Sequence, residues 1–238
     1  MLFAIVNGEK VEANPKTTGL CPSCERTVFS KCGEVNTWHW AHDKDENCDS
    51  WYEPETEWHK SWKLVFGKDN CEIVISKDGD RHIADIMTKK GVVIELQNSP
   101  LQKPIIRKRE TFYGDQMLWI VNGKPFKENF FIFKSQLDED EEYYRFHNPF
   151  SSDYGKVDHS IKNELTFSWN WCRKSWSDVQ RPIFIDFGEE YLFWVIEGMG
   201  TSRGKGKKVT KESFIYKYEG DIELLATLID ESNEKNKQ

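Results

Sequence analysis

The chain has 238 residues and a formal net charge of −7 at pH 7, with 38% hydrophobic and 31% charged residues. This length allows one large or two small domains, and the ten Trp and fifteen Phe residues exclude wholesale disorder. No apolar run approaches the roughly 20 residues of a membrane helix, and the N-terminus lacks the basic segment of a secretion signal. We therefore expect a globular cytoplasmic protein that has no membrane partner and does not coat nucleic acid nonspecifically.

Cysteines are concentrated at the start of the chain. Four of the six lie in the first fifty residues, at Cys21, Cys24, Cys32 and Cys48. Such clustering in an intracellular chain indicates metal binding rather than a disulfide framework, with Cys32 the least suited to be a ligand. Ahead of this cluster, Asn7-Gly8 between two short strand-like runs predicts a β-hairpin over residues 1–13.

The pair Cys21 and Cys24, two residues apart on either side of Pro22-Ser23, is typical of a zinc knuckle. A tetrahedral zinc site needs a second pair of ligands, and the candidates are His39 with His42, or His42 with Cys48. We favour Cys21, Cys24, His42 and Cys48, with His39 as the principal competitor. The alternative is that the thiols are unligated and the histidines are ordinary surface residues.

Residues 55–66 are predicted to form a helix, because Pro54 precedes them and Gly67 follows. Its buried face is the stripe Trp58, Trp62, Val65 and Phe66. Beside this stripe, at intervals of four residues, lie Glu55, His59 and Lys63. These three side chains could line a cleft, although taken alone the spacing favours a charge pair that stabilises the helix.

Segments 81–87 and 92–97 are predicted to form a hairpin around Lys89-Lys90-Gly91, with Gly91 in a left-handed conformation. In that register Asp85 faces Glu95 at about 4.5–5.5 Å between Cβ atoms, and Gln97 projects on the same side as Glu95. Facing carboxylates require a cation, and oxygen ligands favour Mg²⁺ or Mn²⁺. The alternative is that both carboxylates are merely hydrated at an exposed sheet edge.

A helix over residues 105–113 and a buried strand over 117–121 are predicted next. The helix carries Arg107, Lys108 and Arg109, which can hold phosphate or form a solvated face. The acidic run 138–142 indicates a linker and a domain boundary.

The last third of the chain is predicted to be rich in strands, over residues 165–171, 183–187, 191–196 and 213–218. Trp169, Trp171 and Trp176 bracket Arg173-Lys174 and could stack on the bases of a single strand, although core packing is the favoured interpretation. Residues 203–208 are predicted to form a glycine-spaced basic loop that either touches a nucleic-acid backbone or is flexible.

The order helix, three strands, helix and strand, with Asp85, Glu95-Leu96-Gln97 and the upstream Glu55, resembles the core of the PD-(D/E)xK nuclease superfamily. More specifically, the chain resembles the CoiA-like competence proteins. The motifs that carry this likeness, over about residues 1–122, are Cys21-Pro22-Ser23-Cys24, His39-Trp40-Ala41-His42, Glu55-Thr56-Glu57-Trp58-His59 and Ile94-Glu95-Leu96-Gln97-Asn98-Ser99, followed by Arg109 and Tyr113.

The resemblance implies an α+β or α/β fold with a restriction-endonuclease-like core. It implies a zinc-binding module over 1–50 and a nuclease-like domain over 51–137; a β-rich C-terminal domain is expected over 143–238. In the site it implies Asp85 and Glu95 as ligands of Mg²⁺ or Mn²⁺. Gln97 takes the position of the usual catalytic lysine, and Glu55 with His59 act as supporting acid and orienting group.

Two functions follow from these expectations. The first, which is the favoured one, is a metal-dependent nuclease that hydrolyses phosphodiester bonds in DNA during processing, recombination or competence, with Lys63 supplying the charge that Gln97 lacks. In this hypothesis Arg107 and Arg109 bind the substrate. The second is a catalytically inactive DNA-binding protein or recombination mediator, with DNA and recombination or uptake proteins as partners. Gln97 and the acidic total charge favour the second function, whereas the pair Asp85 and Glu95 favours the first.

Overall fold

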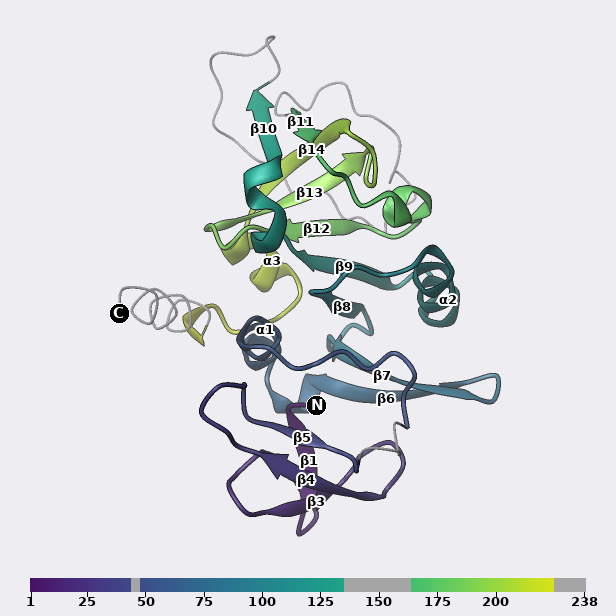
Figure 1. Cartoon of the computed structure of the whole chain (residues 1–238), viewed down its shortest axis with the longest axis vertical. Helices are drawn as coiled ribbons and strands as arrows, with labels where there is room; N and C mark the ends of the chain where they lie inside the picture. The colour runs from purple at the N-terminus through teal and green to yellow at the C-terminus, as the bar shows by residue number, and fades with distance from the viewer. Residues whose placement is uncertain (44–47, 135–163, 225–238) are drawn as a thin grey trace. The chain divides into compact units, whose positions relative to one another are not determined.

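A computed structural model of the chain describes residues 1–43, 48–134 and 164–224. Residue packing divides the chain into two compact units, which we call unit 1 (Met1–Gly91 with Tyr218–Gln238) and unit 2 (Val92–Lys217). Each unit is mixed α/β and, in its described part, has more strands than helices (Figure 1). The acidic run 138–142 lies outside the described residues, and the division into segments 1–50, 51–137 and 143–238 stays a prediction.

The N-terminal part of unit 1 is an antiparallel sheet in the order β2-β1-β3-β4-β5. Its strands are β1 (Phe3–Val6), β2 (Glu9–Glu12), β3 (Thr18–Leu20), β4 (Thr27–Lys31) and β5 (His39–Ala41). The predicted opening hairpin is confirmed, because Asn7 and Gly8 both have positive φ and Val6 pairs with Glu9. The core of this sheet is small and consists of Met1, Ala4, Ala13, Cys21, Val28 and Trp40.

The remainder of unit 1 consists of one helix and one hairpin. These elements are α1 (Glu57–Phe66), the short 3₁₀ helix η1 (Lys68–Asn70), β6 (Cys71–Lys77) and β7 (Asp80–Met87). The predicted helix is confirmed: Thr56 caps its start by accepting a hydrogen bond from the His59 backbone N–H, and Gly67 ends it with φ 77°. Antiparallel β6 and β7 join through Asp78-Gly79, both with positive φ.

Unit 2 begins with a strand–helix–strand segment. Its elements are β8 (Val93–Gln97), α2 (Lys103–Tyr113) and β9 (Met117–Asn122), and both strands are parallel to each other. Every residue of β8 is buried, as expected for a strand covered on both faces. The elements α1, β6, β7, β8, α2 and β9 follow one another in the order predicted from the sequence. Membership of the nuclease superfamily stays a prediction.

The strands of unit 2 follow the order β10-β11-β14-β13-β12-β9-β8. The further elements are η2 (Lys124–Asn129), β10 (Phe130–Lys134), β11 (Leu165–Trp169), η3 (Lys174–Asp178), β12 (Ile183–Asp186), β13 (Tyr191–Glu197), β14 (Arg203–Thr210) and α3 (Lys211–Lys217). β12 is parallel to β9, whereas β10, β11, β14, β13 and β12 pair antiparallel. Aromatic side chains fill one side of this antiparallel region, including Phe130 stacked on Phe167 at 4.7 Å between ring centroids.

Two sequence predictions in this part were wrong. The predicted strand 213–218 lies largely in α3, because Thr210 accepts a hydrogen bond from the Ser213 backbone N–H and caps the helix. The predicted basic loop 203–208 is part of β14. The core interpretation of the tryptophans is confirmed for Trp169 and Trp176, which are buried, and not for Trp171, which is exposed.

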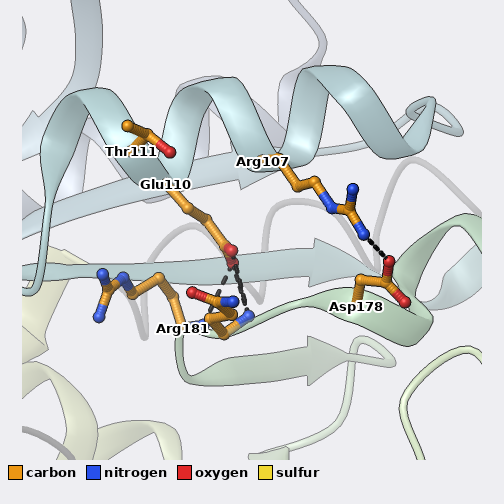
Figure 2. Close-up of a pocket in the computed structure, with 6 residues that line it drawn as sticks. Arg107, Glu110, Thr111, Asp178 and Arg181 are labelled. Atoms are coloured by element: carbon orange, nitrogen blue, oxygen red, sulfur yellow. Dashed lines mark hydrogen bonds and ion pairs between the residues drawn. The ribbon is translucent and has the colours of Figure 1, made fainter.

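A pocket of about 440 Å³ lies beside α2 in unit 2 (Figure 2). The residues that line it are Arg107, Glu110, Thr111, Asp178, Gln180 and Arg181. The Glu110 carboxylate accepts the backbone N–H groups of Gln180 and Arg181, each at 3.1 Å, and therefore ties α2 to the segment after η3. At the other side of the pocket, exposed Arg107 forms an ion pair with Asp178.

Candidate functional site

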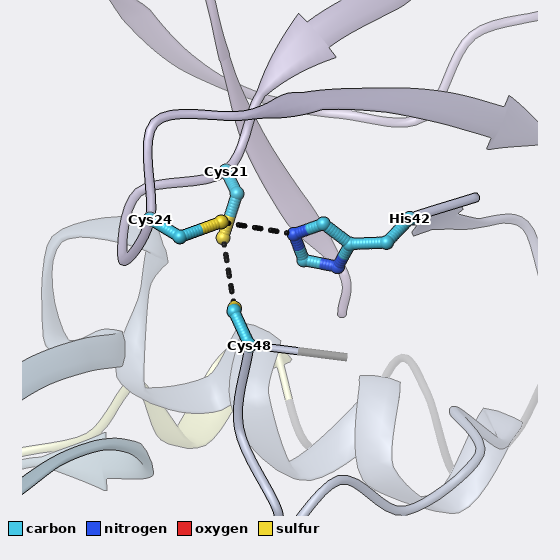
Figure 3. A group of neighbouring side chains, drawn as sticks. All are labelled: Cys21, Cys24, His42 and Cys48. Atoms are coloured by element: carbon cyan, nitrogen blue, oxygen red, sulfur yellow. Dashed lines mark hydrogen bonds between the residues drawn. The ribbon is translucent and has the colours of Figure 1, made fainter. Parts of the chain in front are cut away.

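Four sulfur and nitrogen ligands come together in the N-terminal part of unit 1. The ligand atoms of Cys21, Cys24, His42 and Cys48 all lie within 4.8 Å of one another (Figure 3). The Cys21 and Cys48 Sγ atoms are 3.6 Å apart, and Cys24 Sγ is 3.2 Å from His42 Nε2. A tetrahedral zinc ion with Zn–S bonds of about 2.3 Å places sulfurs about 3.8 Å apart, so the cluster has the dimensions of a zinc site.

The local backbone explains why two of these ligands lie together. Cys21 follows β3, and a turn returns the chain to β4 with hydrogen bonds from Glu25 N to Cys21 O and from Cys21 N to Arg26 O, both 2.9 Å. The Ser23 backbone N–H also points at Cys21 Sγ, at 3.4 Å. This turn is the knuckle predicted from Cys-Pro-Ser-Cys. His42 is the residue directly after β5 and lies next to the turn.

The surroundings of the three thiols shift their pKa values in different directions. Burial raises the pKa of Cys21, and burial together with the neighbouring Cys21 raises the pKa of Cys48 to about 12. Burial also acts against ionisation of Cys24, but hydrogen bonds from Arg26 and His42 outweigh it and lower the pKa of Cys24 to about 6. At neutral pH one thiolate therefore forms readily, and the other two require a positive charge among them.

The sequence analysis favoured the same four residues that the structure brings together. Its competitor, His39, directs Nδ1 to the backbone oxygen of Thr37 at 2.8 Å and is not part of the cluster. Cys32 packs against the small core of the sheet. Within residues 1–43, 48–134 and 164–224, this cluster is the one group of three or more His, Cys, Asp or Glu residues with the spacing of a metal site.

The comparison with known families concerns the segment that holds these ligands. Residues 6–50 match the family described as "Competence protein CoiA, N-terminal domain". The matched stretch contains all four clustered ligands and agrees with the resemblance seen in the motifs of this segment. No curated protein and no solved structure matches the chain. In its described part, the chain contains no helix that is both long and apolar enough to cross a membrane.

Zinc affinity is expected to increase with pH, because Cys21 and Cys48 must release protons before they bind a metal. With two protons released, the change approaches about 100-fold for each pH unit over the range in which both thiols are protonated. Competition with a chelating indicator of known pH dependence, between pH 6 and pH 8, measures this. Equal zinc affinity at both ends of the range would show that these thiols are not the ligands.

The segment after Cys48 is fastened to the β6–β7 hairpin. The Asp49 carboxylate accepts the Ile83 backbone N–H at 2.8 Å and lies 2.9 Å from His82 Nδ1. The ring of Trp51 stacks on His82, with centroids 3.2 Å apart. The sequence analysis missed this contact, because an Asp after a cysteine and a lone His in a strand carry no pairing signal. The chain directly after Cys48 is therefore held by the hairpin that carries Asp85.

A second feature of unit 1 is a buried lysine surrounded by carboxylates. Lys63 Nζ lies 2.9 Å from Glu55, 3.0 Å from Glu72 and 3.3 Å from Asp85. Burial by itself would lower the pKa of Lys63, but the three carboxylates outweigh it and hold this pKa well above its ordinary value. Lys63 is therefore a permanent cation and not a general base. Of the predicted trio, Glu55 and Lys63 form an ion pair, whereas His59 contacts Thr56 and Glu53 instead.

Glu72 is the member of this cluster that sequence reasoning missed. Its carboxylate accepts the backbone N–H groups of Leu2 at 2.6 Å and Phe3 at 2.9 Å. Burial acts to raise the pKa of Glu72, but Lys63 and these backbone groups outweigh it and lower the pKa. Glu72 also has a positive φ of 48°, which a strand-like sequence does not reveal.

The other predicted residues have partners of their own. Buried His59 lies next to the helix cap, with Nδ1 2.8 Å from Thr56 Oγ1 and Nε2 3.5 Å from Glu53. In unit 2, Glu95 and Arg109 form a buried ion pair at 2.9 Å. The amide of Gln97 donates to the backbone oxygen of Ser99 at 2.9 Å.

Asp85 belongs to unit 1 and Glu95 to unit 2, so their joint binding of Mg²⁺ or Mn²⁺ stays a prediction. Their oxygen atoms are the donors that these ions prefer. However, Asp85 shares Lys63 with Glu55 and Glu72, and Glu95 forms an ion pair with Arg109. The described contacts therefore do not support a divalent cation at these carboxylates, and an ion would have to displace both ion pairs. The substrate role of Arg109 also stays a prediction, because its guanidinium is buried against Glu95.

Proposed function

We propose that this protein handles DNA in a competence-related process, and that its first fifty residues bind one structural zinc ion. The observation that carries the proposal is that all four clustered ligands fall within the stretch matching the N-terminal domain of a competence protein. Competence is the uptake of DNA by a cell, so DNA is the partner with which such a protein works. The zinc ion would be bound by Cys21, Cys24, His42 and Cys48 and would stabilise the fold.

Within this role we favour DNA binding, or mediation of recombination, without hydrolysis. Ion pairs with Lys63 and Arg109 support this choice, because they occupy the two carboxylates that a divalent cation would need. Gln97 supports it as well, since an amide carries no charge and cannot act as a base.

The second candidate is a deoxyribonuclease that depends on Mg²⁺ or Mn²⁺. It is supported by the exposure of the Asp85 side chain, which is 23%, against 3% for Glu55 and Glu72 in the same cluster. Asp85 is therefore the carboxylate of this cluster that an ion from solvent reaches most easily. Lys63, held in its charged form, would then lie close to any phosphate bound there.

One experiment separates the two candidates. The zinc-loaded protein is incubated with linear duplex and single-stranded DNA, with and without Mg²⁺ or Mn²⁺, and both complex formation and strand length are measured. We expect binding and intact strands in all conditions. Cleavage that disappears in both Asp85→Asn and Glu95→Gln would establish the nuclease instead. Cleavage that persists in both variants would place the activity outside the predicted carboxylates, and absence of binding would contradict a role on DNA.

A further inference from the structure

An open sheet face in unit 2 combines aromatic and basic side chains. In antiparallel strands, directly paired residues project to the same face. The register of β10, β11 and β14 therefore places six side chains in two rows on one face: Phe131, Ser168 and Arg203 in the first, and Phe133, Thr166 and Lys205 in the second.

The two faces of these strands differ sharply in exposure. On the face with the two rows, the exposed fractions of Phe131 and Phe133 are 45% and 52%, and Arg203 is also exposed. The opposite face is the aromatic core, in which Phe167 and Trp169 are buried. Two large aromatic side chains that are about half exposed on one face of a strand present ring surface that a ligand can contact.

The alternation of glycine and basic residues in β14 follows from the same arrangement. A Cβ atom on Gly204 would lie 2.5 Å from the Phe167 ring, and one on Gly206 would lie 2.5 Å from the Phe193 ring. Only glycine therefore fits on the core face of this part of the strand. The intervening residues Arg203 and Lys205 project to the open face, where Glu197 of β13 is paired with Lys205, and the sequence pattern that resembled a flexible loop is a strand with basic residues on one face.

We propose that this face binds single-stranded DNA, with the rings of Phe131 and Phe133 stacking on unpaired bases and Arg203 and Lys205 contacting the phosphates. Residues two apart on a strand are separated by about 7 Å, which an extended single strand can span from base to base. The cations lie two strand spacings away, at about 10 Å, and the hydroxyl groups of the middle strand lie between. Duplex DNA hides the flat faces of its bases and offers only its phosphates.

The charges on this face permit exchange for a phosphate. Lys205 Nζ lies 3.3 Å from Glu164, but both side chains are partly exposed, and exposed ion pairs of this kind contribute little stability. The proposal relies on the proposed function for its ligand, DNA, and adds the strand form and the surface that binds it.

The test is fluorescence anisotropy with a labelled oligothymidine of about 20 nucleotides, using the full-length zinc-loaded protein without Mg²⁺. We expect the double variant Phe131→Ala/Phe133→Ala to bind at least about tenfold more weakly than the wild type, from the loss of stacking. Arg203→Glu with Lys205→Glu should weaken binding and lower the salt dependence, by about 0.7 in the logarithmic slope for each lost phosphate contact. Tyr216→Ala, an exposed aromatic on α3, is the matched control and should bind as the wild type does.

Several results would overturn the proposal while leaving the role on DNA in place. These are unchanged affinity in both double variants, tighter binding of duplex DNA or of RNA of the same length, and a wild-type dimer that dissociates in Phe131→Ala/Phe133→Ala without a change in DNA affinity. A wild type that binds no DNA would overturn the proposed function as well. The exposed positions should tolerate substitution, and thermal unfolding of each variant verifies that it is folded. If Phe131→Ala/Phe133→Ala is unfolded, the DNA affinity of Arg203→Glu with Lys205→Glu tests the proposal.

Discussion

Cys21→Ala is expected to lose its zinc and, with it, the ordered structure of strands β1 to β5. The core cluster of that sheet contains Trp40 and few aliphatic side chains, so we expect a bound metal to supply much of its stability. Structural zinc in small domains contributes roughly 10–16 kcal/mol of apparent binding free energy, far more than so small a core supplies. Elemental analysis measures the zinc, and amide hydrogen exchange measures the protection of β1 to β5.

Three further variants make this prediction specific. Cys32→Ala removes a thiol from the same sheet but outside the cluster, and it should retain a full equivalent of zinc. His39→Ala should also retain zinc, whereas His42→Ala should not. Retention of zinc by Cys21→Ala, or its loss in His39→Ala but not in His42→Ala, would show that the ligand set is wrong.

Lys63→Met is expected to destabilise the protein by about 3–5 kcal/mol at pH 7, the range found when one partner of a buried ion pair is removed. Methionine nearly preserves the volume of the side chain but leaves the buried Glu55 and Glu72 without Lys63, and with the N-terminal ammonium, 3.9 Å from Glu55, as a nearby cation. Chemical denaturation with zinc in excess measures the free energy of unfolding. Lys60→Met on the same helix is the matched control, because the partly exposed pair of Lys60 with Glu12 should contribute less than about 1 kcal/mol.

The pH dependence of this effect has a definite sign. In the wild type the pKa of Glu72 lies below its ordinary value of 4.5, so the stability that Glu72 contributes is present above that value and is lost as pH falls through the lowered pKa. Without Lys63, burial raises this pKa, and protonation at falling pH relieves the variant. The difference between wild type and Lys63→Met should therefore shrink as pH falls toward 4.5. A difference below 1 kcal/mol at pH 7, or one that grows on acidification, would contradict the role assigned to Lys63.

The features that the sequence predicted correctly are those encoded over short distances. Asn7-Gly8 and Gly67 specify a turn and a helix end through their own backbone conformations. The clustering of Cys21, Cys24, His42 and Cys48 was predictable because the Cys-Pro-Ser-Cys knuckle is local and zinc chemistry restricts the types of residue that could complete it. In each case the deciding information lies within a few residues of the feature or in the chemistry of a single ion.

The features that were missed depend on partners far along the chain. Glu72 accepts hydrogen bonds from the backbone of Leu2 and Phe3, some seventy residues away, and the sequence around Glu72 does not predict that contact. The glycines of β14 were taken as signs of a loop, although they are required by the rings of Phe167 and Phe193. Composition alone does not distinguish a flexible glycine from one that is packed against an aromatic ring.

Whether a zinc-stabilised protein binds DNA is measured by the affinity of the zinc-loaded full-length chain for single-stranded DNA, compared with that of the same protein after zinc removal. We expect the zinc-loaded protein to bind single-stranded DNA saturably. Any affinity that is lost on zinc removal should return when zinc is added back to the zinc-free protein. Absence of DNA binding by protein that carries a full equivalent of zinc would contradict the account.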